Sequence, residues 1–194
     1  MKTDLEVMRV RLTGVTPLLM HSLAGADPNN PLAQEKKSLT AKGKNKSDAD
    51  QVRIEHLDWL LGLYLDDEGR IVVPGECLEG MLNAGAKKRK KGLKMRAGVR
   101  CGFAWPLIYD GPKDLDALYA TPKFQRRAMV SVQRNRIMRV WPKFDKWSVE
   151  FEITFRSDVI TKKDIADMLD VGASELGFMD YRPTFGQFTW EEID

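Results

Sequence analysis

Residues 149 to 155 form the most regular pattern in this 194-residue chain. The apolar side chains of Val149, Phe151, Ile153 and Phe155 alternate there with Glu150, Glu152 and Thr154. Because successive side chains of a strand point to opposite faces, this alternation predicts an amphipathic strand with one buried face. The segment from Leu5 to Thr13 has the same period and predicts a second strand of this kind. The fold must therefore contain a sheet that buries one of its faces.

The last third of the chain adds a helix and another strand. Thr161 is a candidate helix N-cap, and Ile165, Met168 and Leu169 follow it at helical spacing. We expect a final strand from Phe185 to Ile193. Strand, helix and strand in this order match half of a ferredoxin-like sheet. With 43% apolar residues the chain can bury one substantial core, so we expect a single α+β domain, residues 1 to 194, with a ferredoxin-like core and an antiparallel sheet.

The composition changes between Gly14 and Asp50. Prolines stand at positions 17, 28 and 31, and a Lys/Gly/Asn/Ser tract covers residues 42 to 47. Because such a composition favours irregular backbone, we expect residues 23 to 50 to be a long mobile insertion in the domain. A helix should begin after Ser47 or Asp48 and place Val52, His56 and Trp59 on one packing face.

Positive charge is concentrated in two segments, residues 86 to 100 and residues 123 to 143. Together they hold 15 of the 31 Lys and Arg residues and not one Asp or Glu. The other 158 residues carry 16 bases against 28 acids, a segregation that the overall charge of +3 conceals. Since a concentrated cationic surface attracts polyanions and releases their counterions, this pattern predicts nucleic-acid binding.

Both basic segments also have alternative explanations. Cations at a helix C-terminus complement the helix dipole, but two or three bases would suffice for that, and residues 86 to 100 contain eight. The arginines of residues 127 to 139 could lie on an exposed sheet face, although no acid in that segment can pair with them. We therefore expect phosphate contacts from a basic loop at residues 86 to 100 and from the second segment. The candidates are Lys87, Lys88, Arg89, Lys90, Lys91, Lys94, Arg96, Arg100, Arg127, Arg134, Arg136 and Arg139.

Three aromatic residues flank the second segment: Trp141, Phe144 and Trp147. They are candidates for base stacking or for the core.

Several classes of protein do not fit this sequence. It contains no apolar run near 18 residues and no N-terminal signal-peptide pattern, so we expect a cytoplasmic protein without membrane contact. With two histidines and a widely spaced Cys77 and Cys101, the chain has too few ligands for a zinc site. It also has no P-loop, so we expect neither a metal nor a cofactor.

Three segments carry a family resemblance. The segment Thr16–Ser22 after the first strand, Val72–Leu82 with its Pro-Gly between strand and helix, and Leu176–Phe188 with its glycines resemble motifs of the RAMP superfamily. These are the RRM-like subunits of CRISPR ribonucleoproteins. Among them, the backbone subunits that polymerise along a guide RNA fit best. The resemblance implies single-stranded RNA as the partner, self-association into a filament or ring, and association with other CRISPR-type subunits. It also adds His21, Ser22, Gly177, Arg182 and Gly186 as residues that line the path of the strand.

The sequence leaves three alternatives open. His21 is the one candidate for the general acid or base of a RAMP-like endoribonuclease, and the sequence does not identify a second catalytic residue to act with it. In the RAMP superfamily, some backbone subunits cleave RNA with an aspartate in the loop after the first strand. Asp27 or Asp48 could occupy that position. The third alternative is a protein-interaction module that competes with or mimics a CRISPR subunit. We expect no catalytic residue, and the sequence does not decide between RNA and DNA.

Overall fold

The computed structural model describes residues 4 to 132 and 135 to 194, and the chain divides into two compact units. Unit 1 comprises Met1–Leu18, Leu65–Asp110 and Asp145–Asp194, and unit 2 comprises Leu19–Tyr64 and Gly111–Phe144. The sequence predicted one domain with an insertion at residues 23 to 50. That insertion is part of unit 2, which takes in a second stretch of chain as well.

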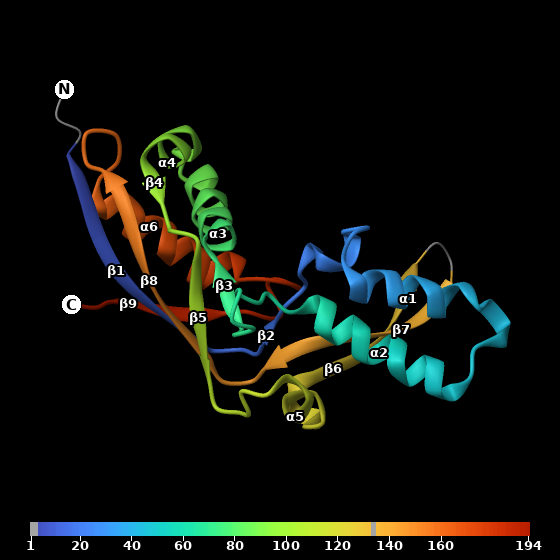
Figure 1. The fold of residues 1–194 in the computed structure, drawn as a ribbon. Coiled ribbons are helices and arrows are strands. Elements are labelled where there is room, and N and C mark those ends of the chain that lie inside the picture. The colour runs from blue at the N-terminus through green and yellow to red at the C-terminus, as the bar shows by residue number, and fades with distance from the viewer. Residues whose placement is uncertain (1–3, 133–134) are drawn as a thin grey trace. The chain divides into compact units, whose positions relative to one another are not determined.

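Unit 1 is built on an antiparallel sheet (Figure 1). Its strands lie in the order β3-β5-β8-β1-β9, and β4 pairs with β8 off this path. Their bounds are β1 Leu5–Gly14, β3 Val72–Pro74, β4 Val99–Arg100, β5 Ala104–Tyr109, β8 Trp147–Arg156 and β9 Phe188–Glu192. The predicted alternation is confirmed, because every second residue of β8 from Trp147 onward is buried. The apolar residues of β1 pair with those of β8, Met8 opposite Ile153 and Val10 opposite Phe151.

Helices cover the apolar face of this sheet. The helices of unit 1 are α3 Gly75–Lys88, α4 Gly92–Gly98 and α6 Lys162–Val171, followed by the π-helical turn η4 Gly172–Leu176. The predicted cap at Thr161 is confirmed, since its hydroxyl oxygen accepts a hydrogen bond from the Asp164 amide in a capping box. Helices α3 and α6 approach closely at Gly85, where a Cβ would stand 2.6 Å from the Met168 carbonyl oxygen. The unit is thus a sheet with one helical layer.

The opposite face of the sheet in unit 1 carries ion pairs. Arg9 lies 3.2 Å from the Glu152 carboxylate, and Arg11 lies 2.6 Å from Glu150 and 2.9 Å from Glu191. These cross-strand pairs follow from the register, which places each arginine opposite a glutamate. Arginine and glutamate neutralise each other on this face.

Unit 2 packs helices against a small sheet. Its elements are α1 Pro31–Ala41, α2 Asp48–Gly62, α5 Leu115–Tyr119, β6 Gln125–Val132, β7 Asn135–Phe144 and the short helical turns η1 Leu23–Ala26, η2 Gly43–Asn45 and η3 Pro122–Phe124. Strand β2, Leu18–Leu19, pairs with β7 where the chain passes from one unit to the other. The predicted pair of strands from Arg127 to Val140 is confirmed as the hairpin β6–β7. Its core includes Leu57, Trp59 and Phe144, all 0% exposed.

The expectation of irregular backbone throughout residues 23 to 50 was wrong, because residues 31 to 41 form α1. The Asn30 side chain accepts hydrogen bonds from the amides of Leu32 and Ala33, and Pro31 occupies the first turn, where its missing N–H costs nothing. The predicted cap Ser47 is confirmed at the start of α2. Val52, expected on the packing face of that helix, is 63% exposed, since Ile54, Leu57 and Leu61 make the contact instead.

His56 on α2 should make the stability of unit 2 sensitive to mild acid. Its ring stacks on Tyr119 at 4.1 Å, and burial, followed by the charge of Arg53, lowers its pKa, while Asp116 and Glu35 oppose this. Because the unfolded chain then takes up the proton more readily, the free energy of unfolding should fall as the pH drops below the ordinary value of 6.5.

Urea unfolding at pH 7.5 and at about pH 5.5, still above the titration range of ordinary carboxylates near pH 4, tests this. The unaltered protein and a His21→Gln control, which changes an exposed histidine, should both lose stability at the lower pH. His56→Gln should abolish the loss. An equal loss in His56→Gln would contradict the assignment.

Candidate nucleic-acid interface

The first basic segment folds as the end of α3, helix α4 and strand β4, all in unit 1. Helix α3 ends in a Schellman motif, in which the Lys91 amide donates to the Ala86 carbonyl at 2.8 Å and the Lys90 amide to Lys87 at 3.1 Å. Lys90 takes the left-handed conformation there, with φ 59°. The predicted basic loop is therefore a helix end and a second helix, which hold its bases in defined positions.

Two of the eight bases in this segment form ion pairs. Lys88 pairs with Glu175, and Lys91 pairs with Asp164. Hydrogen bonds from these lysines lower the pKa of each carboxyl, and the nearby charge of Arg89 adds to the effect on Glu175. The segment itself contains no acid, as expected from the sequence. The two carboxylates come from α6 and η4, which are distant in the sequence and close in the fold.

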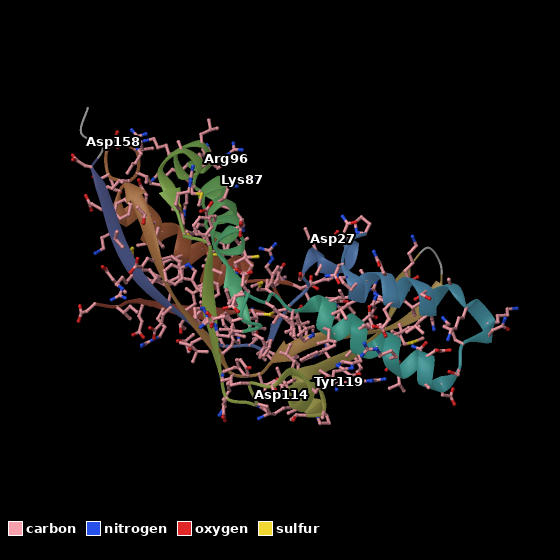
Figure 2. The ribbon with its side chains drawn as sticks, in the orientation of Figure 1. Asp27, Lys87, Arg96, Asp114, Tyr119 and Asp158 are labelled. Carbon is pink, nitrogen blue, oxygen red and sulfur yellow. The ribbon has the colours of Figure 1, made fainter. Side chains whose placement is uncertain are left out.

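Of the six other bases, Arg89 acts on Glu175 through its charge, and the remaining five stay available. Lys87, Lys90, Lys94, Arg96 and Arg100 are exposed and form no ion pair with the residues that the structure describes. Arg100 is oriented by a hydrogen bond to the carbonyl oxygen of Arg96 at 2.9 Å. Figure 2 shows Lys87 and Arg96 on neighbouring helices of unit 1. This is an exposed cationic surface.

A groove of about 460 Å³ lies within this surface. It is lined by Glu79, Gly80 and Asn83 of α3, by Met95 and Arg96 of α4 and by Arg100 of β4. The Glu79 carboxylate accepts a hydrogen bond from the Cys101 amide at 3.0 Å. The buried Oδ1 of Asn83 accepts no hydrogen bond from the described residues. The groove therefore places two guanidinium groups beside the Glu79 carboxylate and the buried Asn83 amide oxygen.

The arginines of the hairpin in unit 2 have a different environment. Arg127 pairs with Glu55, whose side chain is 9% exposed, and Arg139 lies 3.1 Å from Asp58, whose side chain is 5% exposed. Lys36 of α1 also pairs with Asp58. The expectation that Arg127 and Arg139 lack acid partners was wrong, because α2 supplies both carboxylates. Arg136 is exposed, and Arg134 lies outside the described residues.

The loop residues expected along the strand fall into two places. His21, Ser22 and Arg139 line a cavity of about 40 Å³ in unit 2. His21 is exposed, while the Ser22 hydroxyl oxygen accepts from the Ala24 amide at 3.1 Å and caps η1. Asp27 and Asp48, the two candidate catalytic aspartates, also lie in this region. The Asp27 carboxylate accepts a hydrogen bond from the Asn29 amide, and Asp48 lies in the first turn of α2.

Gly177, Arg182 and Gly186 belong to the C-terminal loop of unit 1. Gly186 has φ 72°, and a Cβ there would stand 1.9 Å from the Phe178 carbonyl oxygen, so only glycine fits. Its amide donates to Pro17 at 2.9 Å, which joins the first and third of the resembling segments. The Gly177 amide donates to Gly172. Both glycine amides thus serve the fold of the loop, and Arg182 is its exposed cation.

The flanking aromatic residues are part of the core. Trp141, Phe144 and Trp147 are 9%, 0% and 4% exposed. Their candidate role in base stacking is therefore wrong, because buried rings offer no free face to a base. The indole of Trp147 instead donates a hydrogen bond to the Thr16 carbonyl at 2.9 Å.

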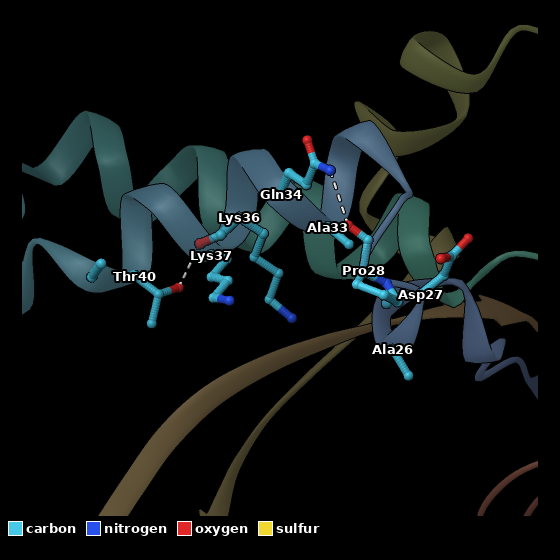
Figure 3. Close-up of a pocket in the computed structure, with 10 residues that line it drawn as sticks. Ala26, Asp27, Pro28, Ala33, Gln34, Lys36, Lys37 and Thr40 are labelled. Atoms are coloured by element: carbon cyan, nitrogen blue, oxygen red, sulfur yellow. Dashed lines mark hydrogen bonds between the residues drawn. The ribbon is translucent and has the colours of Figure 1, made fainter.

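Unit 2 contains a second cavity that the sequence did not predict, because the residues of α1 were expected to form a loop. This hollow of about 740 Å³ in unit 2 is lined by η1, the turn after it and α1 (Figure 3). Lys36 and Lys37 border it, and the Gln34 amide donates to the Pro28 carbonyl at 2.9 Å at its rim. Lys36 and Lys37 stand five and four residues before the end of α1, and they would have indicated this cavity only if the helix had been predicted.

Within the described residues, no group of three His, Cys, Asp or Glu side chains could hold a metal ion. No helix in this part of the chain has the length and apolar character needed to span a bilayer. No protein-family model matches the sequence, and the curated proteins compared with it give no significant match.

Proposed function

We propose that this protein binds single-stranded nucleic acid without sequence preference, RNA in preference to DNA, as a RAMP-like backbone subunit. The observation that carries the proposal is the set of exposed bases around the 460 Å³ groove of unit 1: Lys87, Lys90, Lys94, Arg96 and Arg100. Cations without carboxylate partners gain the most from contact with phosphates. Phosphate contacts position a strand but do not read its sequence, so preference among sequences is weak.

The topology of unit 1 supports a ferredoxin-like core. Helix α3 lies between β1 and β5 in the chain, α6 lies between β8 and β9, and the strand order β5-β8-β1-β9 is antiparallel throughout. This order of helices and strands supports a β-α-β-β-α-β sheet. Together with the three resembling segments, it favours RNA as the strand.

The charges of the two units support side-by-side assembly. Unit 2 contains 14 Lys and Arg against 8 Asp and Glu, a net charge of +6, whereas unit 1 contains 17 against 20, a net charge of −3. Surfaces of opposite charge on one chain favour head-to-tail association between copies. A strand bound to successive copies would hold such a filament or ring together.

Fluorescence anisotropy with single-stranded RNA, single-stranded DNA and duplex DNA across a salt series tests the proposal, with size-exclusion chromatography in parallel. We expect tightest binding to RNA, a steep loss of affinity with salt, and larger species when the strand is longer. Absence of binding at low salt would refute the proposal and direct attention to an acidic protein partner.

A further inference from the structure

Phe103 is an exposed aromatic residue that follows Arg100 of the basic groove of unit 1 by three positions. Its side chain is 93% exposed, although its backbone is held firmly. The Phe103 carbonyl accepts a hydrogen bond from the Gly75 amide at 2.8 Å, and Gly102 before it packs so closely that a Cβ on Gly75 would stand 1.9 Å from its carbonyl oxygen. The ring is therefore presented to solvent from a fixed position.

The neighbouring ring is placed differently. The indole of Trp105 donates a hydrogen bond to the Cys101 carbonyl and is partly buried. An aromatic ring held in water close to cations offers a face on which a base can stack.

Gly80 on α3 supports the same conclusion. It lies in the interior of the helix, where glycine is less favourable than alanine, and a Cβ there would meet nothing within 4 Å. At Gly85 of the same helix, by contrast, a Cβ would clash with the Met168 backbone. Packing within the chain explains Gly85 but not Gly80. Because Gly80 lines the groove together with Arg96 and Arg100, a glycine there allows a ligand to approach the helix closely.

The backbone leading to Phe103 runs beside the first turns of α3. The Cys101 amide donates to Glu79, which lines the groove, and the Gly75 amide donates to the Phe103 carbonyl. From Gly75 to Gly80 the helix rises about 7.5 Å, at 1.5 Å per residue. Phe103 and the groove therefore lie within reach of one short strand.

We infer that Phe103 stacks on an unpaired base while Arg96 and Arg100 hold the adjoining phosphates across Gly80. The inference rests on the proposed function and specifies the ligand further. Single-strand binders combine a basic groove with an aromatic ring that accepts any base, because every base has a π face. In a duplex these faces are already stacked within the helix, so the site selects single strands.

The test compares binding of oligo-uridine with binding of an abasic strand of the same length, by fluorescence anisotropy. Phe103→Ala should bind oligo-uridine about tenfold more weakly, with the salt slope and the affinity for the abasic strand unchanged. Phe103→Trp should restore the affinity. Leu93→Ala, which removes a 78% exposed side chain from the same basic segment, is the matched control and should bind normally.

Gly80 provides an independent variant that leaves the fold intact. Gly80→Gln should weaken binding to both strands at least tenfold and leave the melting temperature unchanged or higher, because its side chain occupies the groove without a clash. Unchanged affinity in Phe103→Ala and Gly80→Gln, with normal binding by the unaltered protein, would overturn this site alone. Failure of the unaltered protein to bind any strand would overturn the proposed function with it.

Discussion

The double variant Lys87→Gln/Arg96→Gln should bind single-stranded RNA about 50-fold more weakly than the unaltered protein at 50 mM salt, but only about twofold more weakly at 0.5 M. Each single-strand phosphate contact contributes about 0.7 to the slope of log affinity against log salt, so the slope should fall by about 1.4. Both side chains are exposed and form no ion pair with the described residues, so the fold should not suffer. Anisotropy titrations across the salt series measure both quantities.

The same basic segment offers a matched control. Lys88→Gln/Lys91→Gln removes the same two charges, but these lysines already pair with Glu175 and Asp164. The control should therefore reduce the salt slope by less than half as much. If both variants lost affinity equally, net charge rather than the free bases would carry the binding. If neither lost affinity, the groove of unit 1 would not be the phosphate site.

Arg127→Met should lower the free energy of unfolding of unit 2 by about 2 to 3 kcal/mol. Among the described residues, the change leaves the Glu55 carboxylate, 9% exposed, with only the hydrogen bond from the Gln51 side-chain amide at 3.1 Å. Removing one partner of a fully buried pair costs about 3 to 5 kcal/mol, and the value here is lower because Arg127 is half-exposed. Urea unfolding, followed by tryptophan fluorescence, measures the loss.

Two further variants separate this structural role from RNA binding. Glu55→Met/Arg127→Met should recover most of the stability, because no buried charge is left alone. Arg136→Met, on the same hairpin, should change stability by less than about 0.5 kcal/mol, since the residue is exposed. If Arg127→Met were as stable as the unaltered protein but bound RNA more weakly, the structural role would be contradicted. Arg127 would then be assigned to the RNA-binding surface.

Strand alternation and helix-capping residues were predicted correctly from the sequence, because each depends on residues that are close together in the chain. The alternation of β8 identified its buried face, and the capping residues Ser47 and Thr161 identified the starts of α2 and α6. These features depend on neighbours within a few residues along the chain. Helix α1 was missed because its prolines and lysines suggested a loop, although Asn30 followed by Pro31 is a helix-start signal.

The candidate site was predicted in part. The segment from Lys87 to Arg100 does form an exposed basic surface, but which of its bases remain free depended on Asp164 and Glu175, far along the chain. The sequence also offered no signal for Phe103, because an isolated phenylalanine between two short strands is ordinarily a core residue.

By itself, the sequence determined the strand faces, the helix caps and the location of the basic segments, because these follow from periodicity and composition. Only the tertiary structure decided which charges are neutralised. Arg127 and Glu55 lie 72 positions apart, and Lys91 and Asp164 lie 73 apart. Long-range folding sets such distances, and the strength of an ion pair depends on distance and burial, so the free bases could be identified only in three dimensions.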